Sequence, residues 1–188
     1  METLWSVCIG IGLATACGLR VFVPLLTVAI ASHFGGLPLS PGFQWLGSTP
    51  ALIAFSVAAG LEIAGYYLPW IDNVLDTIAT PSAILAGTLV SVALMTNLPP
   101  FYKWALGIIA GGGMAGLVQG TTVVARGASS AGTGGLGNPL LSTAELTGSI
   151  VLSILAIVAP ALVVLVVAAA LCFIARRFLR RISPLTGG

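Results

Sequence analysis

Charged side chains are scarce in this chain of 188 residues, which carries seven Lys or Arg and five Asp or Glu. Charged residues make up 6% of the sequence and apolar residues 57%, whereas a soluble domain is about 25% charged. So few charges cannot hydrate the surface of a soluble particle, so the chain is predicted to fold within a lipid bilayer. This composition excludes a soluble enzyme. The net charge of +2 excludes a basic surface for nucleic acid.

Metal-binding and nucleophilic residues are also scarce. The three cysteines lie in apolar runs without CxxC spacing, and His33 is the single histidine. We therefore expect no disulfide framework, no metal site and no cofactor. The sequence has no Ser/His/Asp arrangement and no nucleophile elbow, so we expect no enzymatic activity. A lipid-headgroup enzyme using Mg²⁺ at Asp72 and Asp76 is the weakest alternative.

Strand-like alternation is absent, and the apolar residues form continuous runs long enough to cross a bilayer as helices. We predict an all-α polytopic membrane protein with about five transmembrane helices. Arg20 and Pro24 interrupt the first run, so it is expected to be one tilted or broken span, and Pro160 is expected to kink the last. A short amphipathic helix at 70–79 is expected at the membrane interface. The predicted spans are residues 4–32, 50–68, 81–98, 104–124 and 144–175.

The positions of Lys and Arg orient the chain, because cytoplasmic flanks of membrane proteins are enriched in them. Four arginines near the C-terminus place that end in the cytoplasm. Counting back through five spans places Lys103 and the 33–48 loop inside. The same count places the N-terminus, the helix at 70–79 and Arg126 on the outside of the membrane. Arg126 begins a glycine-rich loop at 126–141. A six-span arrangement remains an alternative. The four arginines are Arg176, Arg177, Arg180 and Arg181.

The two halves of the chain share a pattern that indicates an internal duplication within a single membrane domain, 1–188. The repeat units are 1–98 and 104–175, followed by a basic tail at 176–188. Because the first unit holds an odd number of spans, the second is predicted to be inverted, as in transporters whose site lies where the repeats meet. Chance similarity between glycine-rich segments is the alternative. The matched segments are Gly18-Leu19 with Gly116-Leu117, 35–38 with 134–139, and 48–49 with 142–143.

Arg20 and Glu62 are the leading candidate site residues. Both lie well inside predicted spans, where an unpaired charge costs about 3 kcal/mol or more on insertion scales. We therefore predict that they pair across neighbouring helices. The pair acts either as a gate, proton relay or substrate-binding charge, or as a structural bridge that fixes helix register.

Three other acidic residues have weaker candidate roles. Asp72 and Asp76 are spaced i, i+4 on the interfacial helix, where they either attract a cation at the outer mouth or form a solvated polar face. Glu145 follows Ser142 in an S-x-x-E pattern, which is typical of a capping box at the start of a helix.

The fourth predicted span is dense in glycine. Its GxxxG spacings favour close helix packing. The run Gly111, Gly112 and Gly113 alternatively unwinds to offer backbone groups to an ion, with Gln119 and Thr121 as polar lining.

Four segments of the sequence, 18–26, 61–81, 110–121 and 134–139, resemble the bacterial membrane family catalogued as domain of unknown function 4126. The resemblance spans nearly the whole chain. It implies an integral protein of the bacterial inner membrane and points to Arg20, Glu62, Asp72 and Asp76. It supplies no substrate.

These observations together predict a small inner-membrane transporter or channel for an ion or small solute, with its pathway at the repeat interface. Five short spans make few walls around a cavity, so a homo-oligomer in the lipid bilayer is expected. A non-catalytic accessory, scaffold or lipid-binding membrane protein is the alternative.

Overall fold

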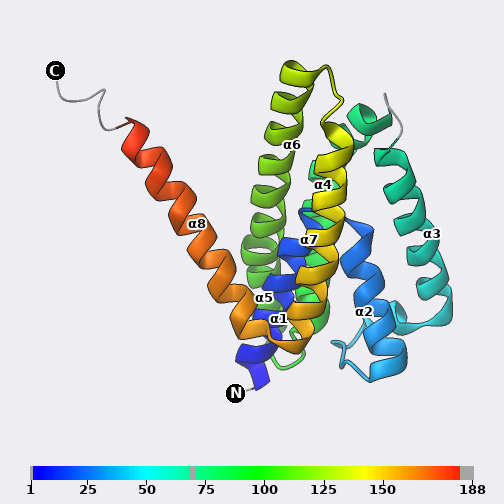
Figure 1. Ribbon diagram of the computed structural model, residues 1–188. Coiled ribbons are helices and arrows are strands. Elements are labelled where there is room, and N and C mark those ends of the chain that lie inside the picture. The colour runs from blue at the N-terminus through cyan, green and yellow to red at the C-terminus, as the bar shows by residue number, and fades with distance from the viewer. Residues whose placement is uncertain (1, 68–70, 183–188) are drawn as a thin grey trace.

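The regular secondary structure is all helical over the part of the chain that the structure, a computed structural model, describes: residues 2–67 and 71–182 (Figure 1). Side chains are described there except at 71–74, 170–171, 174–175 and 177–182. In chain order the elements are α1 (Glu2–Cys17), α2 (Phe22–Gly35), η1 (Gln44–Gly47), α3 (Thr49–Tyr66), α4 (Ile71–Leu94), α5 (Pro100–Leu106), η2 (Gly107–Gly112), α6 (Gly113–Thr133), α7 (Asn138–Val158) and α8 (Pro160–Ile182).

Four helical stretches in the described ranges are long and apolar enough to cross a bilayer. The molecule is therefore an all-α polytopic membrane protein, as the composition predicts. Shorter apolar helices are found at Glu2–Cys17, Phe22–Gly35 and Pro160–Ala169. The four stretches are Thr49–Tyr66, Leu75–Leu94, Pro100–Thr133 and Asn138–Val158.

Helices α1 and α2 form a hairpin that enters the bundle and returns to the same end. As drawn in Figure 1, α1 rises from the lower end, beside the N-terminus, to about mid-height, and α2 descends again. The chain turns between them at Gly18, where an added Cβ would lie 2.5 Å from the carbonyl oxygen of Ala115 on α6. The prediction of one span over 4–32 is therefore wrong, because the turn reverses the chain at the centre of the bundle.

The second predicted span is confirmed and becomes α3. Its N-cap is Ser48, whose hydroxyl accepts a hydrogen bond from the Ala51 N–H at 3.3 Å, and Pro50 lies in the first turn.

Helix α4 runs without a break from Ile71 through Pro81 to Leu94. A separate interfacial helix at 70–79 is therefore not formed as predicted, and residue 70 lies outside the described residues. Proline is tolerated inside membrane helices because neighbouring groups and local adjustments satisfy the freed backbone.

Helix α6 corrects the prediction of a loop at 126–141, because it continues to Thr133. The glycine-rich sequence still forms a helix here, since lipid offers no other hydrogen-bond partners to the backbone. The helix ends at Gly134, in the left-handed conformation with φ 63°. Ser142 and Thr143, predicted to open the next helix, lie inside α7.

The glycine run of the fourth predicted span is helical rather than unwound. Gly107–Gly112 forms the wide π-helical turn η2. A Cβ added at Gly111 would collide with the Ser91 side chain and lie 2.7 Å from the Gly87 carbonyl oxygen on α4. Close packing against α4 is therefore the role of Gly107, Gly111 and Gly112.

The last predicted span, 144–175, is two helices. Ala159, with φ −141° and ψ 63°, ends α7 before Pro160 begins α8. Figure 1 shows α7 descending to the lower end and α8 rising away from the bundle toward the upper end. Lys103 and Arg176, predicted to share one side of the membrane, therefore lie toward opposite ends.

One pair of the matched segments behind the predicted duplication has the same structure in both halves, and another pair does not. Gly36 ends α2 and Gly134 ends α6, both in the left-handed conformation, and they lie at opposite ends of the bundle in Figure 1. In contrast, Gly18 lies in a turn and Gly116 lies within α6. The inverted repeat stays a prediction.

Helix α1 is the centre of the packing. It contacts α2, α4, α6, α7 and α8, and its inner half places Leu13 and Cys17 in the core without solvent exposure. The tip of the α1–α2 hairpin is thus held by helices on every side. Other members of the core are Val21, Leu25, Val28, Ala83, Ala86, Val90, Leu94, Ala115, Ala156 and Val163.

Candidate functional site

Five charged residues from five segments meet beside the tip of the hairpin, and we call them the ionic cluster. Glu145 lies about 10 Å from the upper end of α7, which begins at Asn138, at 1.5 Å per residue. Each of the five is at least largely buried. The members of the cluster are Arg20 in the α1–α2 turn, Glu62 on α3, Asp76 on α4, Arg126 on α6 and Glu145 on α7.

Arg20 is 1% exposed and pairs with α7, not with Glu62 as predicted. Its Nη2 lies 3.5 Å from Glu145 Oε2 and donates to the Ser142 carbonyl oxygen at 3.0 Å. The prediction of a buried Arg20 is confirmed and its partner is corrected. Position along the chain fixes the depth of a residue, whereas the partner depends on which face each helix turns inward.

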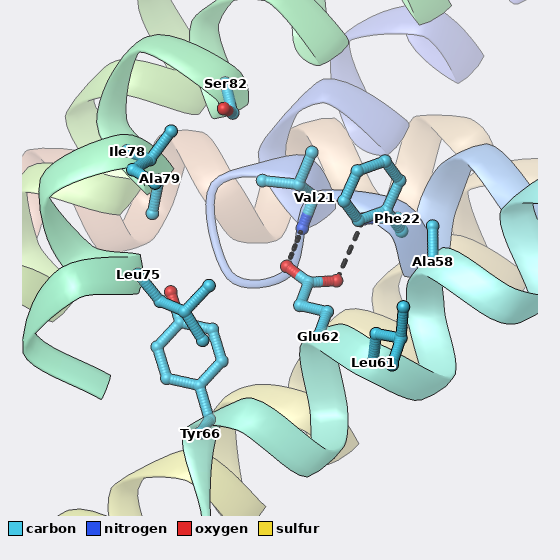
Figure 2. A pocket seen from close by; sticks show the side chains of 10 residues that line it. All are labelled: Val21, Phe22, Ala58, Leu61, Glu62, Tyr66, Leu75, Ile78, Ala79 and Ser82. Atoms are coloured by element: carbon cyan, nitrogen blue, oxygen red, sulfur yellow. Dashed lines mark hydrogen bonds between the residues drawn. The ribbon is translucent and has the colours of Figure 1, made fainter. Parts of the chain in front are cut away.

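Glu62 instead binds the free end of α2. Its two carboxylate oxygens accept hydrogen bonds from the backbone N–H groups of Val21, at 2.7 Å, and Phe22, at 3.0 Å. Figure 2 shows the carboxylate aimed at this helix end. The first N–H groups of a helix have no partner within the helix and carry partial positive charge. Glu62 on α3 supplies both the acceptor and the negative charge.

Arg126 is a site residue that sequence reasoning missed. It is 3% exposed and makes a two-point contact with Glu145, in which Nε lies 3.1 Å from Oε1 and Nη2 contacts Oε2. Its Nη1 lies 3.4 Å from Asp76 Oδ1. Because α6 extends past the predicted end of the span, Arg126 lies inside the bundle instead of on an outer loop.

Glu145 corrects the interpretation of the S-x-x-E pattern. The helix begins at Asn138, two turns before Glu145, so this carboxylate is not part of a capping box. Glu145 instead bridges Arg20 and Arg126. One carboxylate shared by two buried guanidinium groups keeps both charges paired in a setting of low dielectric constant.

Tyr66, at the end of α3, is a second residue that the sequence did not indicate. The guanidinium carbons of Arg20 and Arg126 lie 3.9 and 4.0 Å from the centre of its ring. Guanidinium groups at this distance are attracted by the ring electrons. The ring therefore holds both arginines while their polar edges contact α7.

Helix α7 buries five polar side chains along one face, whereas Thr143 and Thr147 are exposed. Ser149 donates to the Ala16 carbonyl oxygen at 3.1 Å, and the Ser153 hydroxyl has no hydrogen-bond partner among the described residues. In a membrane helix this arrangement lines the protein interior with polar groups. The buried polar residues of α7 are Asn138, Ser142, Glu145, Ser149 and Ser153.

The two polar residues predicted to line a pathway on α6 separate in the structure. Gln119 is buried on the same face as Arg126, while Thr121 is exposed on the opposite face and donates to the Val118 carbonyl oxygen. Thr122, one residue later, is the threonine that faces inward. Gly113 also lies on the exposed face, with open space around it.

Asp76 faces inward to Arg126, so it is not a free charge at a membrane surface. The side chain of Asp72 lies outside the described residues. Within the ranges that the structure describes, no three His, Cys, Asp or Glu side chains are grouped closely enough to hold a metal ion.

A groove of about 410 Å³ opens between α3 and α4 beside the ionic cluster. Figure 2 shows Glu62 and Tyr66 from α3, Val21 and Phe22 at the start of α2, and Leu75 and Ile78 on the α4 wall. The lining is mostly apolar, and the Glu62 carboxylate contributes charge to it. Leu61 and Ile78 at its rim are exposed on the outer surface of the bundle. The remaining lining residues are Ala58, Ala79 and Ser82.

Comparison with known proteins identifies the family of this chain. No curated protein and no solved structure matches it. A family model described as Domain of unknown function (DUF4126) matches residues 7–181, which include every member of the ionic cluster. Since this match covers nearly the whole sequence, the chain belongs to the family described as Domain of unknown function (DUF4126).

Proposed function

We propose that the protein is a small transporter of the bacterial inner membrane that moves an ion or small solute past the tip of the α1–α2 hairpin. The observation that carries this proposal is the break between α1 and α2 at the centre of the bundle, with Glu62 bound to the N–H groups at the start of α2. Discontinuous helices of this kind form the substrate and ion sites of many secondary transporters.

The polar interior between α1, α6 and α7 supports transport over a purely structural role. Buried ionisable and hydroxyl side chains are costly in a membrane protein and mark ion or substrate paths by default. Here they extend along α7 from Asn138 past the ionic cluster to Ser153. Asp76 and Glu145 are paired with the arginines, and Glu62 is held by backbone N–H groups. This closed arrangement suits a carrier with a closed resting state better than an open pore. No enzymatic step is part of the proposal.

We further propose that the upper end of the bundle is cytoplasmic. The four C-terminal arginines lie in the last turns of α8, toward that end, while Lys103 lies near the start of α5 at the lower end. Positively charged flanks are enriched on the cytoplasmic side. The C-terminus and the N-terminus then keep their predicted sides, the cytoplasm and the outside. The 36–48 segment and Lys103, which the sequence placed inside, face outward in this arrangement.

A homo-oligomer remains part of the proposal. Gly113, Gly120 and Gly127 on α6 have open space around them within the single chain. Exposed glycines on a membrane helix allow a second helix to approach closely.

The test is charge movement in proteoliposomes of the purified protein on solid-supported membranes, under jumps of pH, Na⁺, K⁺ and common anions. Wild type, Glu62→Gln and Glu2→Gln are compared, because Glu2 carries the same charge at an exposed position. A current that Glu62→Gln alters and Glu2→Gln leaves intact supports the proposal. Equal currents in all three would count against a role for Glu62 in transport.

The groove between α3 and α4 favours a second candidate, a lipid-binding accessory protein. Its walls are mostly apolar and it opens on the surface that faces lipid. Absence of current under every jump, together with lipid that stays bound to the wild type through purification and is lost on Leu75→Trp, which fills the groove, would favour this candidate.

A further inference from the structure

The N-terminus of α2 has the chemistry of an anion site, and a carboxylate of the protein itself occupies it. The N–H groups of Val21 and Phe22 both donate to Glu62, and α2 is 14 residues long. The start of such a helix attracts anions through its free N–H groups and its dipole. A carboxylate from another helix, α3, is the group that these donors hold.

Arg20 provides a second, independent indication of an anion. It directly precedes Val21 and is 1% exposed, yet its Nε and Nη1 have no hydrogen-bond acceptor among the described residues. Its Nη2 alone is used, toward Ser142 and Glu145. A buried guanidinium with unused donors is costly unless an acceptor reaches it. The Arg20 guanidinium lies against the ring of Tyr66, which lines the groove beside the start of α2. An anion in that groove would therefore lie near donors that have no acceptor.

The groove beside Glu62 provides room for the rest of a ligand. It includes Val21, Phe22 and Glu62 in its lining and measures about 410 Å³, with mostly apolar walls. That volume lies in the range of small-molecule sites, which combine apolar walls with a few polar groups that fix orientation. The lining therefore fits a compact apolar body whose charged end reaches the N–H groups.

We propose that the start of α2 binds a monovalent organic anion with a compact apolar body, in competition with the carboxylate of Glu62. Binding displaces Glu62 from the N–H groups of Val21 and Phe22, and release of the anion lets Glu62 return. Exchange of one anion for another leaves both backbone donors satisfied, so neither state exposes unpaired N–H groups to the membrane interior. This names the substrate class of the proposed transporter and rests on that function.

The test measures binding of benzenesulfonate, which stays anionic across the accessible pH range, to the full-length protein in detergent by isothermal titration calorimetry. Removing the competing carboxylate with Glu62→Ala is expected to tighten binding at least tenfold. Glu62→Gln is expected to give a smaller gain, because its amide oxygen still accepts from one N–H. Benzylammonium and benzyl alcohol, which lack the negative charge, are expected to show no gain in either variant.

Asp76→Asn is the matched control for the general electric field, because it removes one negative charge from the ionic cluster without freeing the N–H groups of α2. A gain below threefold is expected for it. An equal gain in Asp76→Asn and Glu62→Ala would overturn the proposal, as would equal gains for benzyl alcohol and benzenesulfonate.

Unchanged benzenesulfonate affinity in Glu62 variants that keep wild-type helicity by circular dichroism would also overturn the proposal. If Glu62→Ala loses its helicity, Glu62→Gln carries the test. Failure of the anion site and failure of the proposed transport function give different results. Currents from another solute with no binding of benzenesulfonate would refute the anion site alone. Binding without any current would refute transport alone.

Discussion

At the scale of single residues, two arginines share one carboxylate in the interior of a membrane protein. Arg20 and Arg126 both contact Glu145, and Asp76 and Tyr66 complete the shell around Arg126. Each guanidinium would be costly to bury by itself. The cluster is therefore stable as a unit, and removal of its shared member is the most damaging single change.

Glu145→Gln is expected to destabilise the fold by about 3–5 kcal/mol, because it leaves two buried positive charges without their common partner. Unfolding of the purified protein in mixed micelles, followed by circular dichroism while the denaturing detergent is raised, measures the change. Glu2→Gln, at an exposed position, is expected to change stability by less than about 0.5 kcal/mol. A loss below about 1 kcal/mol in Glu145→Gln would contradict the shared-carboxylate arrangement.

Two variants of Tyr66 distinguish the contribution of its ring electrons to stability from that of apolar packing. Tyr66→Phe keeps the ring that both guanidinium groups contact, so its loss of stability is expected to stay below about 0.5 kcal/mol. Tyr66→Leu keeps apolar bulk but removes the ring, and a loss of about 1–3 kcal/mol is expected from two buried contacts. The same unfolding assay applies, and equal stability of the two variants would show that the contacts contribute nothing.

Sequence reasoning identified the burial of Arg20 and Glu62 but not their partners. Burial follows from position within an apolar run, which one sequence provides. Pairing depends on the rotation of each helix about its axis and on the end of α6, and neither is set by spacing alone. The inward-facing stripe on α7, with polar residues at Ser142, Glu145 and Ser149, has helical spacing and was available as a signal.

At the scale of elements, the close contact of η2 with α4 explains part of the glycine content. Gly111→Ala would push a methyl group into Ser91 and the Gly87 backbone, so it is expected to destabilise the protein by about 1–3 kcal/mol. Gly60→Ala, inside α3 and with open space around it, is expected to be neutral or stabilising by up to about 1 kcal/mol. Thermal unfolding in detergent compares them, and equal effects would refute the close packing of η2.

The elements most easily predicted were those bounded by strong local signals. Helix α3 begins at a serine and proline pair and lies within one apolar run, and both features survive in the structure. The end of α6 was predicted wrongly, because glycine ends helices in water but is compatible with them in lipid. The Gly18 turn is set by the approach of α6, which no local pattern records.

At the scale of the whole molecule, the hairpin places the N-terminus and the 36–48 segment at the same end. In a variant whose native cysteines are replaced by alanine, Glu2→Cys and Pro41→Cys are expected to react with an impermeant maleimide from the outer side. Leu136→Cys, at the upper end and 85% exposed, is expected to react from the cytoplasmic side. Labelling in intact cells and in inverted vesicles shows from which side each cysteine reacts. Reaction of Glu2→Cys and Pro41→Cys from opposite sides would show that the α1–α2 segment spans the membrane.

In the proposed transporter, Glu62, bound to the start of α2, controls movement of a solute through the protein. The most direct measurement is the current of wild type and Glu62→Gln proteoliposomes at matched protein content, under the jump that gives the largest wild-type signal. We expect Glu62→Gln to change the peak current at least threefold, because a neutral amide no longer satisfies both N–H groups of α2. Superimposable currents from two folded proteins would contradict the claim.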